Sequence, residues 1–394
     1  MAGPLDGVLV ADFSRVLAGP LCTVNLADLG ATVVKVERPG KGDDTRAWGP
    51  PWSPHGSTYF ESVNRSKLSV ALDLKDPTDH AMALELATRA DVLVENYRPG
   101  ALERHGLGYD QVRSVNPGII YCSITGFGAS AGADLMGYDF VVQAVGGLMS
   151  ITGEPDNQPT KAGVALVDVL TGKDATIGVL AALASRRGSG QGCRVEVNLL
   201  SSLLGSLVNQ AQGFLETGDT PARMGNRHPS IAPYETLGCR DGLLAVACGN
   251  DSQFVRFAEV ISSPELSTDS RFATNSARVA HRGDLVAALE SALAADDAAS
   301  WAPRLTAVQV PAGKVGTLAD GFALAERLGL APTIEVGPSH TRQVRQAITY
   351  SPQLVTVPTP PPALGADTDA VRAWLASPPG NPLSTIHPTE EVHS

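Results

Sequence analysis

Short apolar runs alternate with longer segments of helical periodicity through the first half of the chain. The apolar runs have the length and Val, Leu and Ile content of buried strands, and they lie at residues 8–12, 32–37, 68–74, 91–96 and 119–125. Helical patterns lie between them, at residues 20–30, 77–89 and 99–105. Strands that alternate with helices predict an α/β fold with a parallel sheet and right-handed crossovers.

The pattern changes after residue 125. A Gly-rich stretch without clear periodicity is followed by predicted elements, namely a helix at 171–186, a strand at 193–197 and a helix at 199–216. Residues 218–233 have the composition of a loop or linker. A second unit then begins near residue 234, with a strand at 243–247 and helical patterns to about residue 308.

Composition narrows the class of partner. The 394 residues suffice for two or three compact units, and 43% of them are hydrophobic and 18% charged. A net charge of −11 argues against a nucleic-acid or membrane-surface partner, because those partners need a clustered basic face. No signal peptide and no membrane-spanning apolar stretch is visible. We therefore expect a cytoplasmic protein.

The cysteines and histidines show no arrangement typical of a metal or disulfide framework. The five cysteines are widely spread and never form a C-x-x-C pair. The eight histidines lack ligand spacing. We expect reduced thiols and no bound metal.

The first strand–loop–helix–strand unit resembles a dinucleotide-binding unit, and its second strand ends in Glu37. The turn after the first strand, however, reads DFSRVLAGP. It contains no G-x-G-x-x-G sequence through which a pyrophosphate could approach the helix. The sequence therefore argues against a nicotinamide dinucleotide.

Three basic residues lie at or beyond the ends of predicted strands: Arg38, Lys75 and Arg104. Because the carboxyl ends of parallel strands meet at one edge of a sheet, these cations could converge on a phosphate-bearing ligand. The alternative is that all three are solvated surface charges, the usual state of Lys and Arg. Spacing alone leaves both interpretations open.

An apolar run in KAGVALVDVLTGKDATIG leads to Asp168 at the start of a predicted helix. One interpretation is a helix cap, in which the carboxylate accepts backbone N–H groups. The other is a nucleophile, because a partly desolvated carboxylate can attack an activated acyl group. No Ser-His-Asp set or phosphate-cradling loop competes with this candidate.

Several motifs follow one another in a recognisable order. They are LDGVLVADFSRVLAGPLCT, LGATVVKVERPGKGDDTR, VENYRPGALERHGLGYD, GYDFVVQAVGGLMSITGEPD and the G-x-x-x-x-D spacing from Gly163 to Asp168, then GNRHPSIAPYETL and VPAGKVGTL. This succession resembles family III CoA-transferases, which include formyl-CoA transferase, the carnitine CoA-transferase and the α-methylacyl-CoA racemases. The resemblance covers most of the chain.

The resemblance implies an architecture. It predicts a Rossmann-like large domain over residues 1–220, completed by about 325–394, and a small domain with linkers over 221–324. It also predicts an interlocked homodimer, in which two chains pass through each other.

The resemblance also implies roles for individual residues. Asp168 falls on the family's catalytic aspartate. The residues that fall on CoA contacts are Val16, Leu17, Ala18, Arg38, Leu72, Lys75, Asn96, Tyr97, Arg104 and Tyr138. Leu17 stands where formyl-CoA transferase has a glutamine, and its glycine-rich mobile loop is not found here, which argues against a formyl/oxalate substrate pair. Tyr138 stands where the racemases have a histidine, which favours transfer over racemisation.

The expected activity is therefore transfer of CoA from an acyl-CoA donor to a small carboxylic acid through an aspartyl-CoA thioester on Asp168. A dicarboxylate such as succinate is the expected kind of donor acid. Two alternatives stay open: a 2-methylacyl-CoA racemase, and a CoA-binding relative without catalytic activity.

Overall fold

The computed structural model describes residues 3–353 and 357–378. The chain divides into two compact units, each with its own hydrophobic core. The first consists of Met1–Gly146, Ala162–Thr217 and Ala331–Ser394, and the second of Gly147–Lys161 and Gly218–Leu330. Compared with the expected domain limits, residues 147–161 group with the second unit, and the chain returns to the first unit at Ala331.

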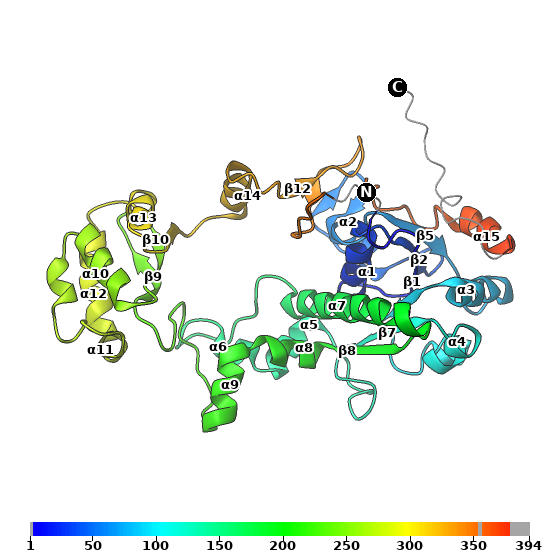
Figure 1. The fold of residues 1–394 in the computed structure, drawn as a ribbon, viewed down its shortest axis with the longest axis horizontal. Coiled ribbons are helices and arrows are strands. Elements are labelled where there is room, and N and C mark those ends of the chain that lie inside the picture. The colour runs from blue at the N-terminus through cyan, green and yellow to red at the C-terminus, as the bar shows by residue number, and fades with distance from the viewer. Residues whose placement is uncertain (1–2, 354–356, 379–394) are drawn as a thin grey trace. The chain divides into compact units, whose positions relative to one another are not determined.

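A six-stranded parallel sheet forms the centre of the first unit (Figure 1). Its strands are β1 (Leu9–Asp12), β2 (Thr32–Glu37), β5 (Lys67–Ala71), β6 (Val92–Glu95), β7 (Ile120–Thr125) and β8 (Arg194–Asn198). They run in the order β5-β2-β1-β6-β7-β8, with Val10 opposite both Val33 and Val92. The predicted parallel α/β sheet is confirmed, and its strand order is that of a Rossmann fold.

Helices cover the sheet and connect its strands. They are α1 (Ala18–Asp28), α2 (Thr58–Ser62), α3 (Pro77–Arg89), α4 (Tyr109–Val115), α5 (Asp139–Val145), α7 (Leu166–Ser189), α8 (Leu199–Ser206), α9 (Val208–Thr217) and α15 (Thr368–Ala376). Two 3-10 turns lie at Asp44–Ala47 and Glu103–His105. Two short hairpins pair β3 (Trp52–Ser53) with β4 (Gly56–Ser57), and β12 (Thr333–Ile334) with β13 (Gln343–Val344).

Local sequence explains α3, whose bounds match the prediction. Asp76 precedes the helix, and its carboxylate accepts hydrogen bonds from the N–H groups of Thr78 and Asp79. Pro77 occupies the first turn, where a missing N–H costs nothing. A capping residue and a proline therefore fix where this helix begins.

The C-terminal helix α15 completes the core of the first unit. Val371 and Trp374 are buried in the cluster built from the strands and α3. Ser69 of β5 donates its N–H to the Asp367 carboxylate, and its carbonyl accepts the N–H of Asp367. Residues nearly 300 positions apart thus share one core.

The second unit combines a small antiparallel sheet with short helices. The sheet has the order β11-β10-β9, with bounds Ala312–Lys314, Leu243–Ala247 and Tyr234–Gly238. Its helices are α6 (Leu148–Ile151), α10 (Asp251–Val260), α11 (Asn275–Ala280), α12 (Arg282–Leu293), α13 (Ala298–Ala307) and α14 (Leu318–Arg327), with a 3-10 turn at Pro264–Ser267. Within the described residues, no helix of either unit is both long and apolar enough to cross a bilayer.

Several predicted elements differ from the structure in extent or type. The stretch expected to be irregular contains α5, and α7 begins at Leu166, five residues before the predicted start at 171. The helix expected over 199–216 is two helices, because Val208 adopts a φ of 41°. The helix expected at 99–105 is a 3-10 turn.

Candidate active site

The strand order creates a crevice between β1 and β6. The chain proceeds from β1 outward to β2 and β5, and then returns to the other side of β1 through β6. The loops that follow β1 and β6 therefore leave the sheet in opposite directions. Such a switch point is where open parallel sheets bind ligands.

A cavity of about 360 Å³ occupies this place. Its walls come from the loop after β1, the loop after β6, the segment that follows β7 and the first turn of α7. The residues that line it include Arg15, Val16, Leu17, Ala18, Asn96, Tyr97, Arg98, Gly126, Gly137, Tyr138 and Asp168. All of them belong to the first unit.

Two close backbone contacts give the cavity its shape. A Cβ atom on Gly172 of α7 would lie 2.6 Å from the carbonyl oxygen of Ala18, so only glycine lets α7 approach α1 this closely. A Cβ on Gly126 would lie 2.5 Å from the Cα of Gly137. These glycines bring Asp168, one turn before Gly172, beside the loop that follows β1.

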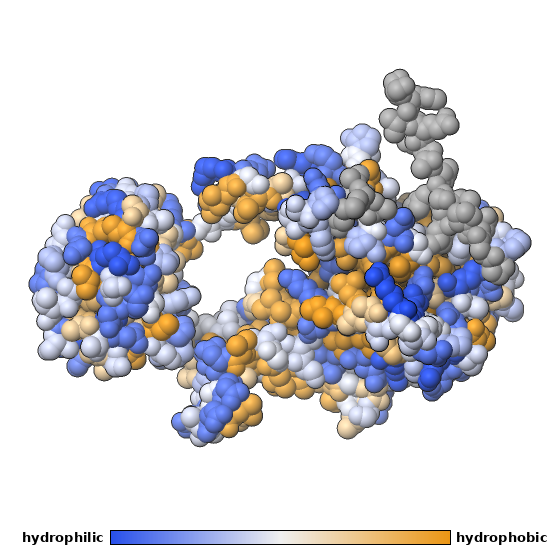
Figure 2. Space-filling view, viewed as in Figure 1, coloured by the Kyte–Doolittle hydropathy of each residue, from blue (hydrophilic) through white to orange (hydrophobic). Residues whose placement is uncertain are grey.

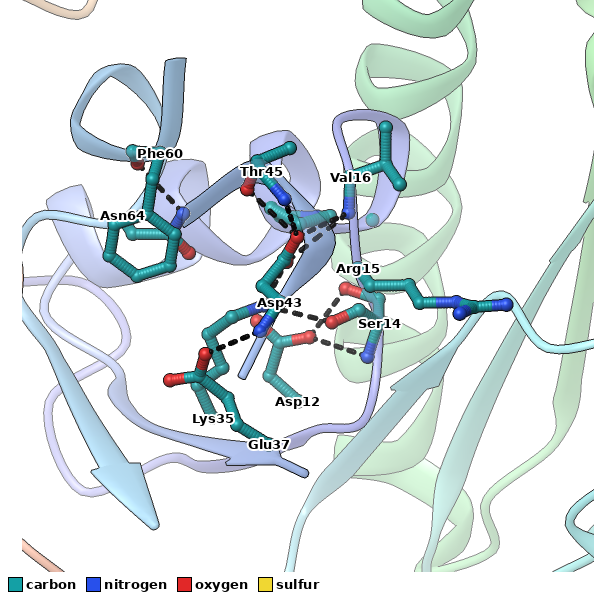
Figure 3. Close-up of polar contacts among 12 residues, drawn as sticks. Asp12, Ser14, Arg15, Val16, Lys35, Glu37, Asp43, Thr45, Phe60 and Asn64 are labelled. Atoms are coloured by element: carbon teal, nitrogen blue, oxygen red, sulfur yellow. Dashed lines mark hydrogen bonds and ion pairs between the residues drawn. The ribbon is translucent and has the colours of Figure 1, made fainter. Parts of the chain in front are cut away.

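That loop is held by hydrogen bonds on both sides of Arg15. The Asn96 side chain accepts the Arg15 N–H at 2.9 Å and donates to the Arg15 carbonyl at 2.7 Å. Ser14 donates its N–H to Asp12, and Val16 donates its N–H to the Asp43 carboxylate (Figure 3). Val16 has a φ of 70°, a left-handed conformation that is uncommon for a β-branched residue.

Buried ions lie beneath the loop. Lys35 forms a 2.9 Å ion pair with Asp43, and both side chains are fully buried. Burial alone would raise the pKa of Asp43, but Lys35 and the hydrogen bonds of Thr45 outweigh it and hold that pKa below its ordinary value. Burial would likewise lower the pKa of Lys35, and the carboxylates around it reverse the shift. Both groups are charged near neutral pH.

Asp168 has none of this compensation. It lies in the first turn of α7, is only partly exposed, and its side chain accepts no hydrogen bond and forms no ion pair within the described residues. Burial, reinforced by the negative charge of Asp139, raises the pKa of Asp168 to about 7. A carboxylate in such surroundings is more basic and more nucleophilic than a solvated one.

The carboxylate of Asp139 caps the start of α7, a role that the sequence left open for Asp168. Its Oδ1 accepts the N–H of Val167 at 2.7 Å and that of Asp168 at 3.2 Å. Gln143 donates to its other oxygen at 2.6 Å and accepts the Ala162 N–H at 2.8 Å. The cap interpretation of Asp168 is therefore wrong: Asp139 caps the helix from α5, and the Asp168 side chain is left to the cavity.

Comparisons with known proteins show the family to which the chain belongs. The family model described as CoA-transferase family III matches residues 5–368. This protein belongs to CoA-transferase family III. The chain is 41% identical to the succinate–glutarate CoA-transferase of Agrobacterium fabrum, over 94% of this chain and 96% of that one.

Two further relatives support the assignment. The acetyl-CoA:oxalate CoA-transferase of Acetobacter aceti is 42% identical over 82% of this chain and 84% of its own. The crystal structure of a CAIB/BAIF family protein from Brucella suis superposes with a TM-score of 0.87 at 41% identity, covering 95% of this chain and all of that one. The resemblance noted in the sequence is confirmed, and the protein is a CoA-transferase.

The structure brings some predicted CoA contacts of this CoA-transferase together and leaves others apart. Those that line the cavity with Asp168 are Val16, Leu17, Ala18, Asn96, Tyr97 and Tyr138. Arg38 lies at the surface, and Asp44 joins it to Arg15 through ion pairs of 2.6 and 3.3 Å.

The remaining predicted contacts lie outside the cavity lining. Lys75 and Arg104 are exposed. Leu72 is 2% exposed, and its side chain packs in the core.

Sequence reasoning missed the residues that support the site. Lys35 interrupts the apolar strand TVVKVE, and a charge inside a buried strand signals a partner elsewhere in the chain. Asp139 and Gln143 are four residues apart and so share a helix face, but that signal needs the helix to be recognised first. Asp43 had no local signal beyond its place in the KGDD turn.

Proposed function

We propose that this CoA-transferase moves CoA from an acyl-CoA to a small carboxylic acid, with Asp168 as the acyl carrier. The observation that carries the proposal is the state of Asp168. Its carboxylate faces a cavity at the switch point of the sheet, and no donor among the described residues stabilises its charge. A structural carboxylate of a folded protein is normally paired or hydrogen-bonded.

The chemistry proceeds by exchange of acyl groups. The Asp168 carboxylate attacks the donor thioester carbonyl, and the C–S bond breaks to give a mixed anhydride and CoA thiolate. The thiolate then attacks the Asp168 carbonyl carbon, which releases the donor acid and leaves an aspartyl-CoA thioester. The acceptor carboxylate attacks this thioester, forms a second anhydride and expels the thiolate. The thiolate finally attacks the acceptor acyl carbon, which yields the new acyl-CoA and restores Asp168.

This sequence conserves the energy of the thioester, so the reaction needs no external energy source. The protein must hold the reacting carbonyl beside Asp168 and keep water away from the anhydride and the thioester. The cavity position of Asp168 and its partial burial serve both needs.

We place the CoA in the crevice after β1 and β6. The first turn of α1 has no side-chain cap, so the N–H groups of Ala18 and Gly19 are available to an anionic or carbonyl oxygen of the ligand. We propose that the phosphates contact three exposed cations, which follow strands of the parallel sheet: Arg38 after β2, Lys75 after β5 and Arg104 after β6. Tyr138, 56% exposed at the start of α5, is proposed to lie near the thioester.

The relatives suggest the kind of acid. By name, the Agrobacterium relative acts on succinate and glutarate and the Acetobacter relative on acetyl-CoA and oxalate, all of which involve small carboxylates. We propose a small dicarboxylic acid, with succinate as the donor acid to test first. The racemase alternative is less well supported, because this chain has Tyr138 where the racemases have a histidine. Both of these relatives are also transferases by name.

We further propose that the protein is a cytoplasmic, interlocked homodimer. Several helices expose large apolar side chains that a single chain leaves uncovered, among them Val145, Ile177, Val208, Leu215 and Leu318. Figure 2 shows hydrophobic residues at the surface of α9 and α14. Light scattering at micromolar concentration should give twice the mass of one chain, and a monomeric mass would refute the dimer.

Covalent trapping tests the acyl carrier. The enzyme is incubated with succinyl-CoA, quenched with hydroxylamine and digested, and the peptide that contains Asp168 is analysed by mass spectrometry. We expect a hydroxamate on Asp168 that is absent from Asp168→Asn and from enzyme given free CoA. A hydroxamate on another residue, or none while turnover continues, would refute the proposal. Exchange of the α-proton of 2-methylbutyryl-CoA in heavy water without an acceptor acid would favour the racemase instead.

A further inference from the structure

Three ion pairs lie together under the loop that follows β1. They are Lys35–Asp43, Lys67–Asp12 and Arg46–Glu37, with separations of 2.9, 3.2 and 2.7 Å. The side chains of the first two pairs are fully buried. Three acids and three bases balance, so the cluster carries no net charge.

Such a cluster has two explanations. It could stabilise the fold, yet a buried ion pair loses about as much in desolvation as it gains in attraction. It could instead impose one conformation on the backbone around it. The contacts of Lys35 and Asp43 decide between these explanations.

The two members of this pair contact backbone on either side of Arg15. Lys35 donates from Nζ to the Ser14 carbonyl at 2.9 Å. The Asp43 carboxylate accepts the Val16 N–H at 3.2 Å through Oδ2, the oxygen that also meets Lys35. Figure 3 shows these contacts converging on the loop. One ion pair therefore contacts the backbone immediately before and immediately after Arg15.

The residue that follows Arg15 is Val16. It lines the cavity and has a φ of 70°. A β-branched side chain disfavours this left-handed conformation, which persists only where the surroundings enforce it. The Oδ1 atom of Asp43 is itself fixed, because Thr45 donates both its N–H and its hydroxyl to it. The acceptor is thus rigid and charged, and suited to hold a strained N–H in place.

We propose that the Lys35–Asp43 pair is a positioning device that holds Val16 in its left-handed conformation and so preforms the loop for CoA. Neither residue lines the cavity, so both act through Val16 and not by contact with the ligand. The inference rests on the proposed role of this loop in CoA binding. It explains why two fully buried charges stand beneath one turn of backbone.

The first experiment removes the pair without leaving an unpaired charge. In the double variant Lys35→Met with Asp43→Asn, the remaining cluster still has two acids and two bases. The Asn oxygen can still serve Thr45, while its NH₂ group replaces the oxygen that faced Val16 and Lys35. Calorimetric titration of the protein with CoA should show at least a tenfold weaker Kd than wild type. Circular dichroism checks that the variant is folded.

The matched control breaks another buried ion pair of the same unit. Asp28 and Arg65 pair at 2.5 Å with side-chain exposures of 11% and 6%, at the far end of α1 from the loop. Asp28→Asn should lower the melting temperature and leave the Kd for CoA within about twofold. Equal Kd losses in the control and in the Lys35/Asp43 variant would overturn the proposal in favour of a general stability effect.

A rescue variant tests the conformational step itself. Glycine adopts a left-handed φ without steric cost. Adding Val16→Gly to the double variant should therefore recover the Kd to within about threefold of Val16→Gly alone. If loss of the Lys35–Asp43 pair weakens CoA binding by the same factor with or without Val16→Gly, the pair does not act through the strain of Val16.

Wild-type protein provides a readout that needs no variant to fold. Hydrogen exchange of the Val16 amide should be slow in CoA-free enzyme, because Asp43 already holds it, and little slower after CoA is added. Fast exchange in the free enzyme that is slowed only by CoA would overturn preformation. Failure of wild type to bind CoA would instead refute the proposed function, and the exchange result would remain interpretable on its own.

Discussion

Asp43 and Asp168 both lie close to the loop that follows β1, but their carboxylates have opposite surroundings. Asp43 meets a buried lysine, a hydroxyl and two backbone N–H groups, and its pKa is held below the ordinary value. Asp168 meets no donor through its side chain among the described residues, and burial beside Asp139 raises its pKa to about 7. The same functional group is a fixed anion in one place and, in the proposed mechanism, the nucleophile in the other.

The difference lies in which elements supply the neighbours. Lys35 comes from a central strand and points into the layer beneath the loop, where it has no access to water. The turn that carries Asp168 is capped by the carboxylate of Asp139. This neighbouring negative charge repels the Asp168 carboxylate, whereas Lys35 attracts that of Asp43. A paired carboxylate serves the structure, whereas an unpaired one keeps its lone pairs for a substrate.

Removal of Asp168 should have the largest effect. Asp168→Ala deletes the proposed acyl carrier, and transfer between succinyl-CoA and glutarate should fall by about 10⁴-fold or more. CoA affinity should stay within a few-fold, because the loop after β1 is untouched. Turnover at a tenth of the wild-type rate would show that the unpaired carboxylate is not the nucleophile.

Breaking a buried pair should act on stability. Lys67→Met removes the cation that is paired with the buried Asp12, and the free energy of unfolding should fall by about 3–5 kcal/mol. Arg372→Met breaks the more exposed pair with Asp79 and should cost about 0–1 kcal/mol. Urea denaturation at one fixed protein concentration measures both. Similar losses of unfolding free energy for the two variants would contradict the expectation that the buried ion pair matters more for stability than the exposed one.

The pH dependence should follow Asp168. In the proposed mechanism only its carboxylate form attacks, so kcat/KM should fall as the pH drops below about 7, the raised pKa of this group. Asp139→Asn removes the neighbouring negative charge while its oxygen can still accept the N–H groups of α7. The acidic limb should then move down by about one pH unit, which raises kcat/KM about fivefold at pH 6.

A carboxylate elsewhere on α7 provides the control for this profile. Asp174 is exposed and accepts a hydrogen bond from Ser202. Asp174→Asn should leave the acidic limb where it is. An unchanged limb in Asp139→Asn would contradict the role of Asp139 in raising the pKa of Asp168.

The smallest effect is a gain in stability. The folded pKa of Asp168 lies above its unfolded value, so the protonated form is favoured in the fold, and this contribution is lost as the pH rises through about 7. Asp168→Asn removes the buried charge and should raise the unfolding free energy at pH 8 by about 1 kcal/mol. The gain should vanish near pH 4, where wild type carries the proton. A loss at pH 8 would mean that Asp168 has a stabilising partner.

Much of the fold followed from local pattern. The bounds of β2 and α3 matched their predictions, because an apolar run between turns and a capped, proline-led helix are local signals. The start of α7 did not match, because its cap comes from Asp139, nearly 30 residues earlier in the chain. The break at Val208 was also missed, since nothing in its neighbours marks a positive φ.

The candidate site shows the same division. Motif order placed Asp168, Val16, Asn96 and Tyr97 in one site, and the structure brings them to one cavity. The motifs did not indicate the roles of Asp43 and of the capping carboxylate Asp139. Those two residues act through hydrogen bonds to backbone far away in sequence, which no spacing rule records.

The amino-acid sequence by itself determined the parallel α/β architecture, the family and the identity of the candidate nucleophile, because periodicity and motifs are properties of neighbouring residues. Only the tertiary structure decided which carboxylates are neutralised and which one is left without a donor. The charge state and reactivity of a buried group depend on the dielectric and the partners around it, and folding assembles both from distant parts of the chain.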